Sequence, residues 1–230
     1  MKSGTPYALF DFADTVAELI PRRQEVVAAH ILEIADINIP EKHIAHCYKL
    51  VDVMMQYSSV RTRTNLQREE FYHKYNQRLL ASLGVLHKVT PKSLFGAFDR
   101  DKKHWALKLG VKQSFAELRK RGYKIGIISN FDARLEQIVY EALGLGDVID
   151  YLHISQSEGI EKPDPRFYLS FFDKHNIPIK QSFYIGDNFT LDFMPATQIG
   201  LKAWLLDEEG LYDYCPTAVR SISDFIELLP

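Results

Sequence analysis

Four groups of polar residues in this sequence stand where strands or turns end, at spacings that suit chemistry on a phosphoryl group. They are Asp11 with Thr15, Ser129 with Asn130, Lys162, and Asp187 with Asp192. A carboxylate can attack phosphorus and form an acyl phosphate. The transferred group carries charge on three oxygens, which need a cation and hydrogen-bond donors. The sequence therefore predicts a site that moves phosphoryl groups through an aspartate.

Each predicted role follows from the chemistry of the side chain. Lys162, in the loop Glu161-Lys162-Pro163-Asp164-Pro165, supplies positive charge, and the Ser129 hydroxyl supplies a donor together with nearby backbone N–H groups. Asp11 and Asp187 would repel each other strongly without a cation between them. Because oxygen ligands and an exposed substrate phosphate favour Mg²⁺, we expect Mg²⁺ as the cofactor. Asp192 belongs to the same metal set, more as a supporting carboxylate than as a direct ligand.

The elements that must position these residues alternate between strand and helix. Continuous apolar runs, typical of buried parallel strands, lie at 7–10, 124–128, 151–154, 183–185 and 202–206. Helical periods separate the later runs, for example Val111, Phe115 and Leu118. Repeated strand-helix-strand units predict an α/β fold, with a parallel Rossmann-like sheet covered by helices on both faces. Open sheets of this kind bind ligands at the carboxyl ends of their strands.

A long helical segment interrupts this pattern after the first strand. Residues 19 to about 105 show helical periods and no convincing strand, with Pro21 in the first turn of a helix and Thr90-Pro91 as a helix start. The interruption is far longer than an ordinary loop. We therefore expect an α/β core domain at 1–16 and 106–230, and an all-helical cap domain at 17–105.

The composition indicates an ordinary globular chain. Of its 230 residues, 46% are hydrophobic and 25% charged, and 28 basic against 30 acidic residues give a net charge of −2. This balance offers no field to recruit nucleic acid or an acidic membrane surface. No apolar run approaches the ~18 residues of a membrane span, and the N-terminus leaves no room for a signal peptide. Two distant cysteines, Cys47 and Cys215, suggest reduced thiols and a cytoplasmic location.

The order of these motifs resembles the haloacid dehalogenase (HAD) superfamily. The motifs are Asp-x-x-x-Thr at Asp11, Ser-Asn at Ser129, Lys-Pro-Asp-Pro at Lys162, and Gly-Asp-Asn-x-x-x-Asp from Gly186 to Asp192. The resemblance covers the whole chain and is strongest to HAD-like hydrolases whose first motif is Asp-x-x-Asp-Thr. It implies that Asp11 is the nucleophile and that the insert is the helical cap of this family. We predict that Thr15 and Asn130 bind the substrate.

One position departs from the family pattern. Ala13 stands where the family usually has a second Asp, which protonates the leaving group and then activates water. Ala13 can do neither, although its backbone carbonyl can still bind Mg²⁺. Loss of general acid–base help typically costs about 10²–10⁴-fold in rate. Asp14, one residue further, replaces a common Gly and is not expected to take over the missing role.

The leading prediction is a Mg²⁺-dependent phosphatase of a small phosphorylated metabolite, either a monomer or a homodimer. Three alternatives remain open because of Ala13. A phosphonoacetaldehyde-hydrolase-like enzyme would use a Schiff-base lysine in the insert, where Lys42, Lys49 and Lys74 lie. A 2-haloacid-dehalogenase-like enzyme would work without Mg²⁺. A non-catalytic binding or regulatory protein would keep only the fold. Arg61, Arg63 and Arg68 could hold an anionic substrate, although a solvated loop is the simpler interpretation.

Overall fold

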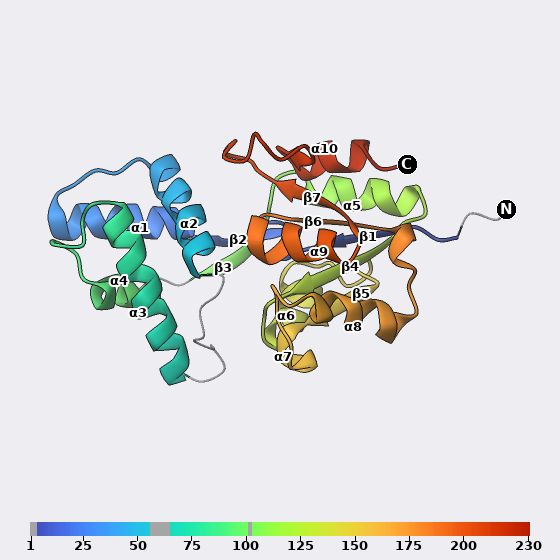
Figure 1. Cartoon of the computed structure of the whole chain (residues 1–230), viewed down its shortest axis with the longest axis horizontal. Coiled ribbons are helices and arrows are strands. Elements are labelled where there is room, and N and C mark those ends of the chain that lie inside the picture. The colour runs from blue at the N-terminus through green and yellow to red at the C-terminus, as the bar shows by residue number, and fades with distance from the viewer. Residues whose placement is uncertain (1–3, 56–64, 101–102) are drawn as a thin grey trace. The chain divides into compact units, whose positions relative to one another are not determined.

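The chain folds into two compact units, which are described separately. A computed structural model describes residues 4–55, 65–100 and 103–230. The first unit comprises Met1–Glu18 and Trp105–Pro230, and the second Leu19–His104. Strands β2 (Ala17–Ile20) and β3 (His104–Leu107) pair as a two-stranded sheet where the chain passes from one unit to the other and back (Figure 1).

A six-stranded sheet forms the centre of the first unit. Its strand order is β5-β4-β1-β6-β7-β8, and the pairings of all neighbouring strands are parallel. The strands are β1 (Tyr7–Phe10), β4 (Lys124–Ser129), β5 (Tyr151–Ile154), β6 (Ser182–Gly186), β7 (Lys202–Leu206) and β8 (Ala218–Val219). The predicted α/β fold and its five strands are confirmed. The two-residue strand β8 was not predicted from the sequence.

Helices cover both faces of this sheet (Figure 1). One apolar core joins Phe10 and Ile127 to Phe115 of α5 and Phe225 of α10, while another joins Leu9 and its neighbours to α8 and α9. Because side chains alternate along a strand, β1 sends Ala8 and Phe10 to one face and Leu9 to the other. The helical segments are α5 (Val111–Lys120), α6 (Arg134–Gln137), η1 (Ile138–Ala142), α7 (Ser155–Glu158), α8 (Pro165–His175), η2 (Ile179–Gln181), η3 (Phe189–Phe193), α9 (Met194–Gln198) and α10 (Ile222–Glu227).

The second unit is built from four helices around its own apolar core. They are α1 (Arg23–Ala35), α2 (Glu41–Met55), α3 (Asn65–Ser82) and α4 (Pro91–Arg100). The Thr90 side chain accepts a hydrogen bond from Ser93 N at 3.1 Å, so the predicted helix start at Thr90-Pro91 is confirmed. Pro21 was placed wrongly in a first helical turn, because α1 is capped by Arg22 and begins at Arg23.

The expectation that residues 17–105 contain no strand was also wrong. β2 and β3 occupy the two ends of this range, and each is only four residues long. Neither strand alternates cleanly between apolar and polar residues, so the period-2 signal that identifies a half-buried strand is weak.

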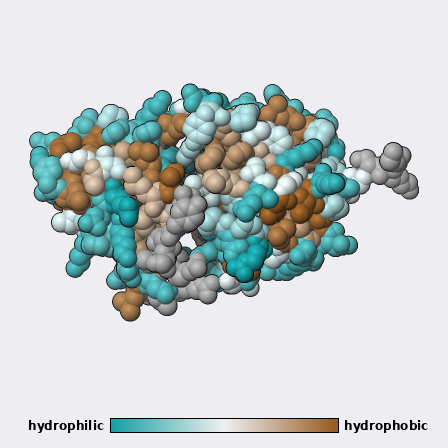
Figure 2. Space-filling view, in the orientation of Figure 1, coloured by the Kyte–Doolittle hydropathy of each residue, from teal (hydrophilic) through white to brown (hydrophobic). Residues whose placement is uncertain are grey.

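Among the described residues, no helix has both the length and the apolar character that crossing a bilayer requires. On the face seen in Figure 2, hydrophilic residues surround separate hydrophobic patches. Cys47 and Cys215 are both free and buried, as expected for reduced thiols.

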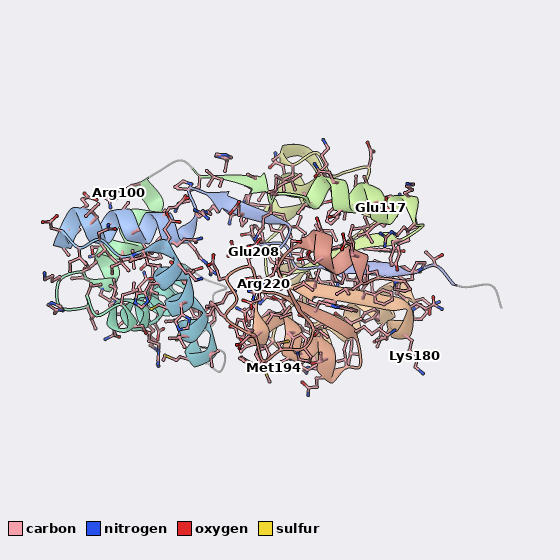
Figure 3. The ribbon with its side chains drawn as sticks, turned by 90° about the horizontal axis from the view of Figure 1, so that it is seen from above. Arg100, Glu117, Lys180, Met194, Glu208 and Arg220 are labelled. Carbon is pink, nitrogen blue, oxygen red and sulfur yellow. The ribbon has the colours of Figure 1, made fainter. Side chains whose placement is uncertain are left out.

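The loop after β7 is held in place by one arginine. Arg220, labelled in Figure 3, donates from Nη1 to the backbone oxygen of Asp207 at 2.8 Å. Gly210 passes so close to the Arg220 guanidinium that a Cβ there would overlap it, and its φ of +72° also favours glycine. The Asp207 carboxylate accepts from Leu211 N and Tyr212 N at 2.9 and 3.0 Å. The loop after the carboxyl end of β7 is therefore held by the Arg220 side chain and by the Asp207 carboxylate.

Asp150 anchors the start of β4. Its carboxylate accepts from Ile125 N at 2.8 Å, Lys124 Nζ at 2.7 Å and Arg119 Nη1 at 2.6 Å. Burial alone would raise the pKa of Asp150, but these donors outweigh it and hold the pKa below the ordinary value of 3.8. A carboxyl with a lowered folded-state pKa stabilises the fold above its unfolded pKa, and that contribution is lost as the pH falls through the lowered value.

We predict that Asp150→Asn lowers the free energy of unfolding at pH 7 by about 1–3 kcal/mol, since hydrogen bonds to a charged group are lost. The difference from wild type should shrink as the pH falls below 3.8. Urea denaturation between pH 7 and pH 3 measures both effects. Asp147→Asn, at an exposed position in the same loop, is the control. A penalty that stays constant with pH would contradict the assigned role.

Candidate active site

A buried ammonium group organises the candidate site. Lys162 Nζ donates to Asp11 Oδ1 at 2.6 Å, to Asp192 Oδ1 at 2.6 Å and to the Tyr184 hydroxyl at 2.9 Å. Lys162 is 4% exposed, Asp11 7% and Asp192 2%. Since an ammonium has three N–H donors, these partners use all of them. The structure thus joins three of the residues predicted from the sequence into one ion-pair network.

The sheet delivers Asp11 to this network. Asp11 directly follows β1, and its backbone N–H donates to Ile185 O at 2.9 Å, which continues the pairing of β1 with β6. Ser129 is the last residue of β4, the neighbour of β1 on the other side, and is buried. The predicted strand-end residues therefore share one edge of the sheet.

Asp192 reaches the network because β6 ends in glycine. Asp192 lies in η3, and its Oδ2 accepts from Asn188 N at 3.1 Å. A Cβ at Gly186 would overlap the Asp192 carboxyl group, so only glycine leaves room for it. Asn188 caps η3, with its Oδ1 accepting from Thr190 N and Leu191 N at 3.0 Å each. Glycine is thus required at position 186 for packing, and the next residue of the motif, Asp187, supplies a carboxylate.

The loop that carries Lys162 is locked to the end of β4. Asn130 Oδ1 accepts from Lys162 N at 2.8 Å, and Asn130 Nδ2 donates to Lys162 O at 3.0 Å. On the other side of the loop, Asp164 caps α8 by accepting from Arg166 N at 3.0 Å. Both polar atoms of the Asn130 side chain therefore hold the Lys162 backbone. Substrate binding by Asn130 remains a prediction, and its contacts here are to the protein.

A tight turn follows Asp11 and places Thr15. Val16 N and Ala17 N both donate to Phe12 O, and Asp14 N donates to Ala17 O at 2.8 Å. Asp14 adopts a φ of +59°, a left-handed conformation that favours Gly, Asn and Asp, which explains Asp at a common Gly position. Thr15 Oγ1 is buried and, among the described residues, has no hydrogen-bond partner. A buried hydroxyl without a protein partner, in the turn that follows Asp11, is suited to an oxygen of a bound ligand.

The charges at the site are unbalanced. Burial, together with the Asp192 and Asp187 carboxylates, raises the pKa of Asp11 to about 7 in spite of the nearby Lys162. Burial lowers the pKa of Lys162, but Asp11 and Asp192 outweigh that effect and hold it above its ordinary value. The lysine therefore stays charged, and the carboxylates of Asp11 and Asp192 share it as their cation. A further positive charge would favour ionised Asp11.

The residues present fit a hard cation. Asp11, Asp187 and Asp192 each offer a carboxylate oxygen, and these oxygens lie within 4.8 Å of one another. All are oxygen ligands, as Mg²⁺ prefers. Asp187 is half-buried beside the more enclosed Asp11 and Asp192. Ala13 is half-buried in the turn after β1, so its side chain leaves the expected acid–base position without a functional group.

Two tyrosines at the site were not predicted as functional residues. Tyr184 donates to Asp192 Oδ1 at 2.7 Å, and Tyr168 donates to Leu191 O at 2.9 Å. Their rings pack in the apolar core, as expected for strand and helix residues, and only their hydroxyls reach polar partners. Tyr184 lies two residues before Gly186 in an apolar strand. Its hydroxyl, a polar atom in an otherwise apolar strand, was the sequence signal that could have indicated a functional role.

The structure gives little information on the residues of the insert that were considered for substrate binding. Arg61 and Arg63 lie outside the described residues, and the side chain of Arg68 is not described. Lys42 and Lys74 are exposed on the second unit, and Lys74 pairs with Glu70 at 2.8 Å. The Schiff-base lysine of the phosphonoacetaldehyde alternative remains a prediction.

Comparison with known proteins adds sequence relatives. The bovine (Bos taurus) haloacid dehalogenase-like hydrolase domain-containing protein 3 is 32% identical over 102 residues, 44% of this chain and 40% of that protein. The glyceraldehyde 3-phosphate phosphatase of Pyrococcus furiosus is 25% identical over 118 residues, 51% of this chain and 48% of that protein. The chain thus matches less than half the length of these relatives.

A structural likeness extends over the entire chain. The crystal structure of a dehalogenase superposes with a TM-score of 0.64 and 18% identity, covering 100% of this chain and 99% of the other. At this identity the likeness establishes a shared fold. Residues 7–200 match the haloacid dehalogenase-like hydrolase family, which is most of the sequence. The chain therefore belongs to the family of haloacid dehalogenase-like hydrolases.

Proposed function

We propose that this hydrolase is a Mg²⁺-dependent phosphatase of a small phosphorylated metabolite. The observation that carries the proposal is the buried Asp11, bonded to Lys162 and within metal-sharing distance of Asp187. A nucleophile, a fixed cation and a carboxylate pair for a metal are the groups that phosphoryl transfer requires. The phosphatase among the sequence relatives supports the same choice.

The metal site would be formed mainly by Asp11 and Asp187. The backbone carbonyl of Ala13 would complete the protein ligands, and Asp192 would support the site while its Oδ1 stays with Lys162. When bound, Mg²⁺ would neutralise charge on the phosphoryl oxygens and on the two carboxylates. Lys162 would keep the Asp11 carboxylate oriented, and the Thr15 and Ser129 hydroxyls would donate to phosphoryl oxygens.

The reaction would proceed in two displacements at phosphorus. In the first, an Asp11 carboxylate oxygen forms a bond to phosphorus, and the bond from phosphorus to the alcohol oxygen breaks. In the second, water attacks phosphorus, the bond to Asp11 breaks, and inorganic phosphate leaves with Asp11 restored. The alcohol oxygen gains a proton in the first step, and the attacking water loses one in the second.

Ala13 sets the expected speed of both steps. Its methyl group can neither give the proton to the leaving alcohol nor take one from water, so solvent must do so. This should cost about 10²–10⁴ in rate relative to an enzyme with a carboxyl group there. We therefore expect a slow phosphatase, with highest activity on esters whose leaving group needs little protonation.

A dehalogenase is the second candidate, since a dehalogenase shares the fold and the reaction needs no acid at position 13. It would leave the cluster of Asp11, Asp187 and Asp192 with Lys162 but no second cation to balance its charge. Chloride release from 2-chloropropionate without metal would favour this function. A cytoplasmic location, the absence of nucleic-acid partners and a monomeric or homodimeric state remain predictions.

We predict that Asp11→Asn reduces phosphate release to background, because the amide cannot attack phosphorus. A panel of phosphate esters with Mg²⁺, assayed for wild type and variant, measures this. Asp173→Asn makes the same exchange at an exposed helix position and should keep wild-type activity. Phosphatase activity retained in Asp11→Asn would overturn the proposed function.

We also predict that Ala13→Asp raises kcat, by up to about 10²–10⁴-fold, because a carboxyl group is restored where the leaving oxygen needs a proton. The largest gain should occur for alkyl phosphates, which have poor leaving groups. The double variant Asp11→Asn/Ala13→Asp should be inactive. An unchanged or lower kcat in a folded Ala13→Asp protein would show that Ala13 does not limit the rate.

A further inference from the structure

The Tyr184 hydroxyl occupies the junction of the ion-pair network. It donates to Asp192 Oδ1 at 2.7 Å and accepts from Lys162 Nζ at 2.9 Å. The same Asp192 oxygen accepts from Lys162 at 2.6 Å. Lysine nitrogen, phenol oxygen and carboxylate oxygen therefore form a closed triangle, which Asp11 joins through its own bond to Lys162.

The remainder of the Tyr184 side chain belongs to the apolar core. Tyr184 lies in the middle of β6, in register with Leu9 on one side and Ala203 on the other. Its ring is fully buried and meets the ring of Tyr168 edge-on, with centroids 5.3 Å apart. A phenylalanine would fill this space equally well. Packing therefore explains the ring of Tyr184 but not its hydroxyl.

Burying that hydroxyl is favourable only because its partners are charged. A buried polar group without a partner costs free energy, and a hydrogen bond to a charged group is stronger than one between neutral groups. Tyr184 has both an acceptor, Asp192, and a donor, Lys162.

We propose that Tyr184 is a positioning residue of the active site, whose hydroxyl fixes Asp192 against Lys162 and so sets the place of the ammonium beside Asp11. Lys162 has three N–H groups and three acceptors, Asp11, Asp192 and Tyr184. Removing one acceptor leaves an N–H unsatisfied in a closed site. The ammonium must then turn or admit a water, and the Asp11 carboxylate loses its fixed orientation.

This inference rests on the proposed function for its kinetic effect and on geometry alone for its structural effect. A misplaced ammonium should impair attack by Asp11 more than it impairs substrate binding. Tyr184→Phe should therefore lower kcat by about 10–100-fold, the range set by a lost hydrogen bond to a charged group, and change KM little. A loss of stability alone would not separate kcat from KM in this way.

The test compares Tyr184→Phe with a matched loss of a buried phenol elsewhere. Tyr123 is equally buried in the same unit, and its hydroxyl donates to Pro230 O at 2.7 Å, so Tyr123→Phe is the control. Kinetics with the ester that wild type hydrolyses best, together with thermal unfolding, are measured for wild type and both variants. We expect similar melting temperatures for the variants and a lower kcat only for Tyr184→Phe. Equal kcat in the two variants, or a change confined to KM, would overturn the proposal.

High-resolution crystal structures of wild type and Tyr184→Phe provide a readout that needs no turnover. We expect Lys162 Nζ to move away from Asp192 Oδ1 or to take a water in place of the hydroxyl. An ion-pair geometry unchanged from wild type would overturn the proposal. If wild type hydrolyses no ester, the proposed function fails, and this comparison still decides the role of Tyr184. If wild type is active, Asp11→Asn is inactive and Tyr184→Phe matches wild type, only the present inference fails.

Discussion

The site depends on one constraint, a lysine ammonium buried between two carboxylates. Lys162 is removed from water, and its charge survives only because Asp11 and Asp192 each lie 2.6 Å away. Much of the surrounding structure serves this arrangement. Parallel pairing brings the ends of β1 and β6 together, Gly186 leaves space for Asp192, and Asn130 holds the backbone of Lys162. Together with Asp187, these carboxylates exceed the one lysine in charge, which favours a further cation beside them.

The sequence was sufficient for most of the fold and for the charged part of the site. The continuous apolar runs of β1, β4 and β6 predict parallel strands, and residues that follow such strands must meet at one edge. Asp11 was predicted in this way, whereas Lys162 and Asp192 were predicted from their places in the Lys-Pro-Asp-Pro and Gly-Asp-Asn motifs. The turn after β1 explains Asp14 in the same terms, since its left-handed backbone tolerates Asp.

The remaining features depend on tertiary contacts that a single sequence does not encode locally. Tyr184 is indistinguishable from a core residue in an apolar strand until the position of Asp192 is known. Strands β2 and β3 lack the continuous apolar run that identifies β1, and β8 has only two residues. The segment η3 has its π-helical form within the packed Gly-Asp-Asn loop. The Asn130 side chain holds the backbone of Lys162, a partner 32 residues away in sequence, and this contact was not expected. Its predicted role in substrate binding stays a prediction.

The proposed mechanism requires that Asp11 becomes phosphorylated, and chemical trapping tests this requirement most directly. Wild-type protein turning over a phosphate ester with Mg²⁺ is quenched and treated with borohydride, which reduces an aspartyl phosphate to homoserine. Peptide mass spectrometry then reads position 11. Homoserine is expected at this position, and only in samples that contained substrate. Active turnover with Asp11 left unmodified, or homoserine at another aspartate, would contradict the proposed mechanism.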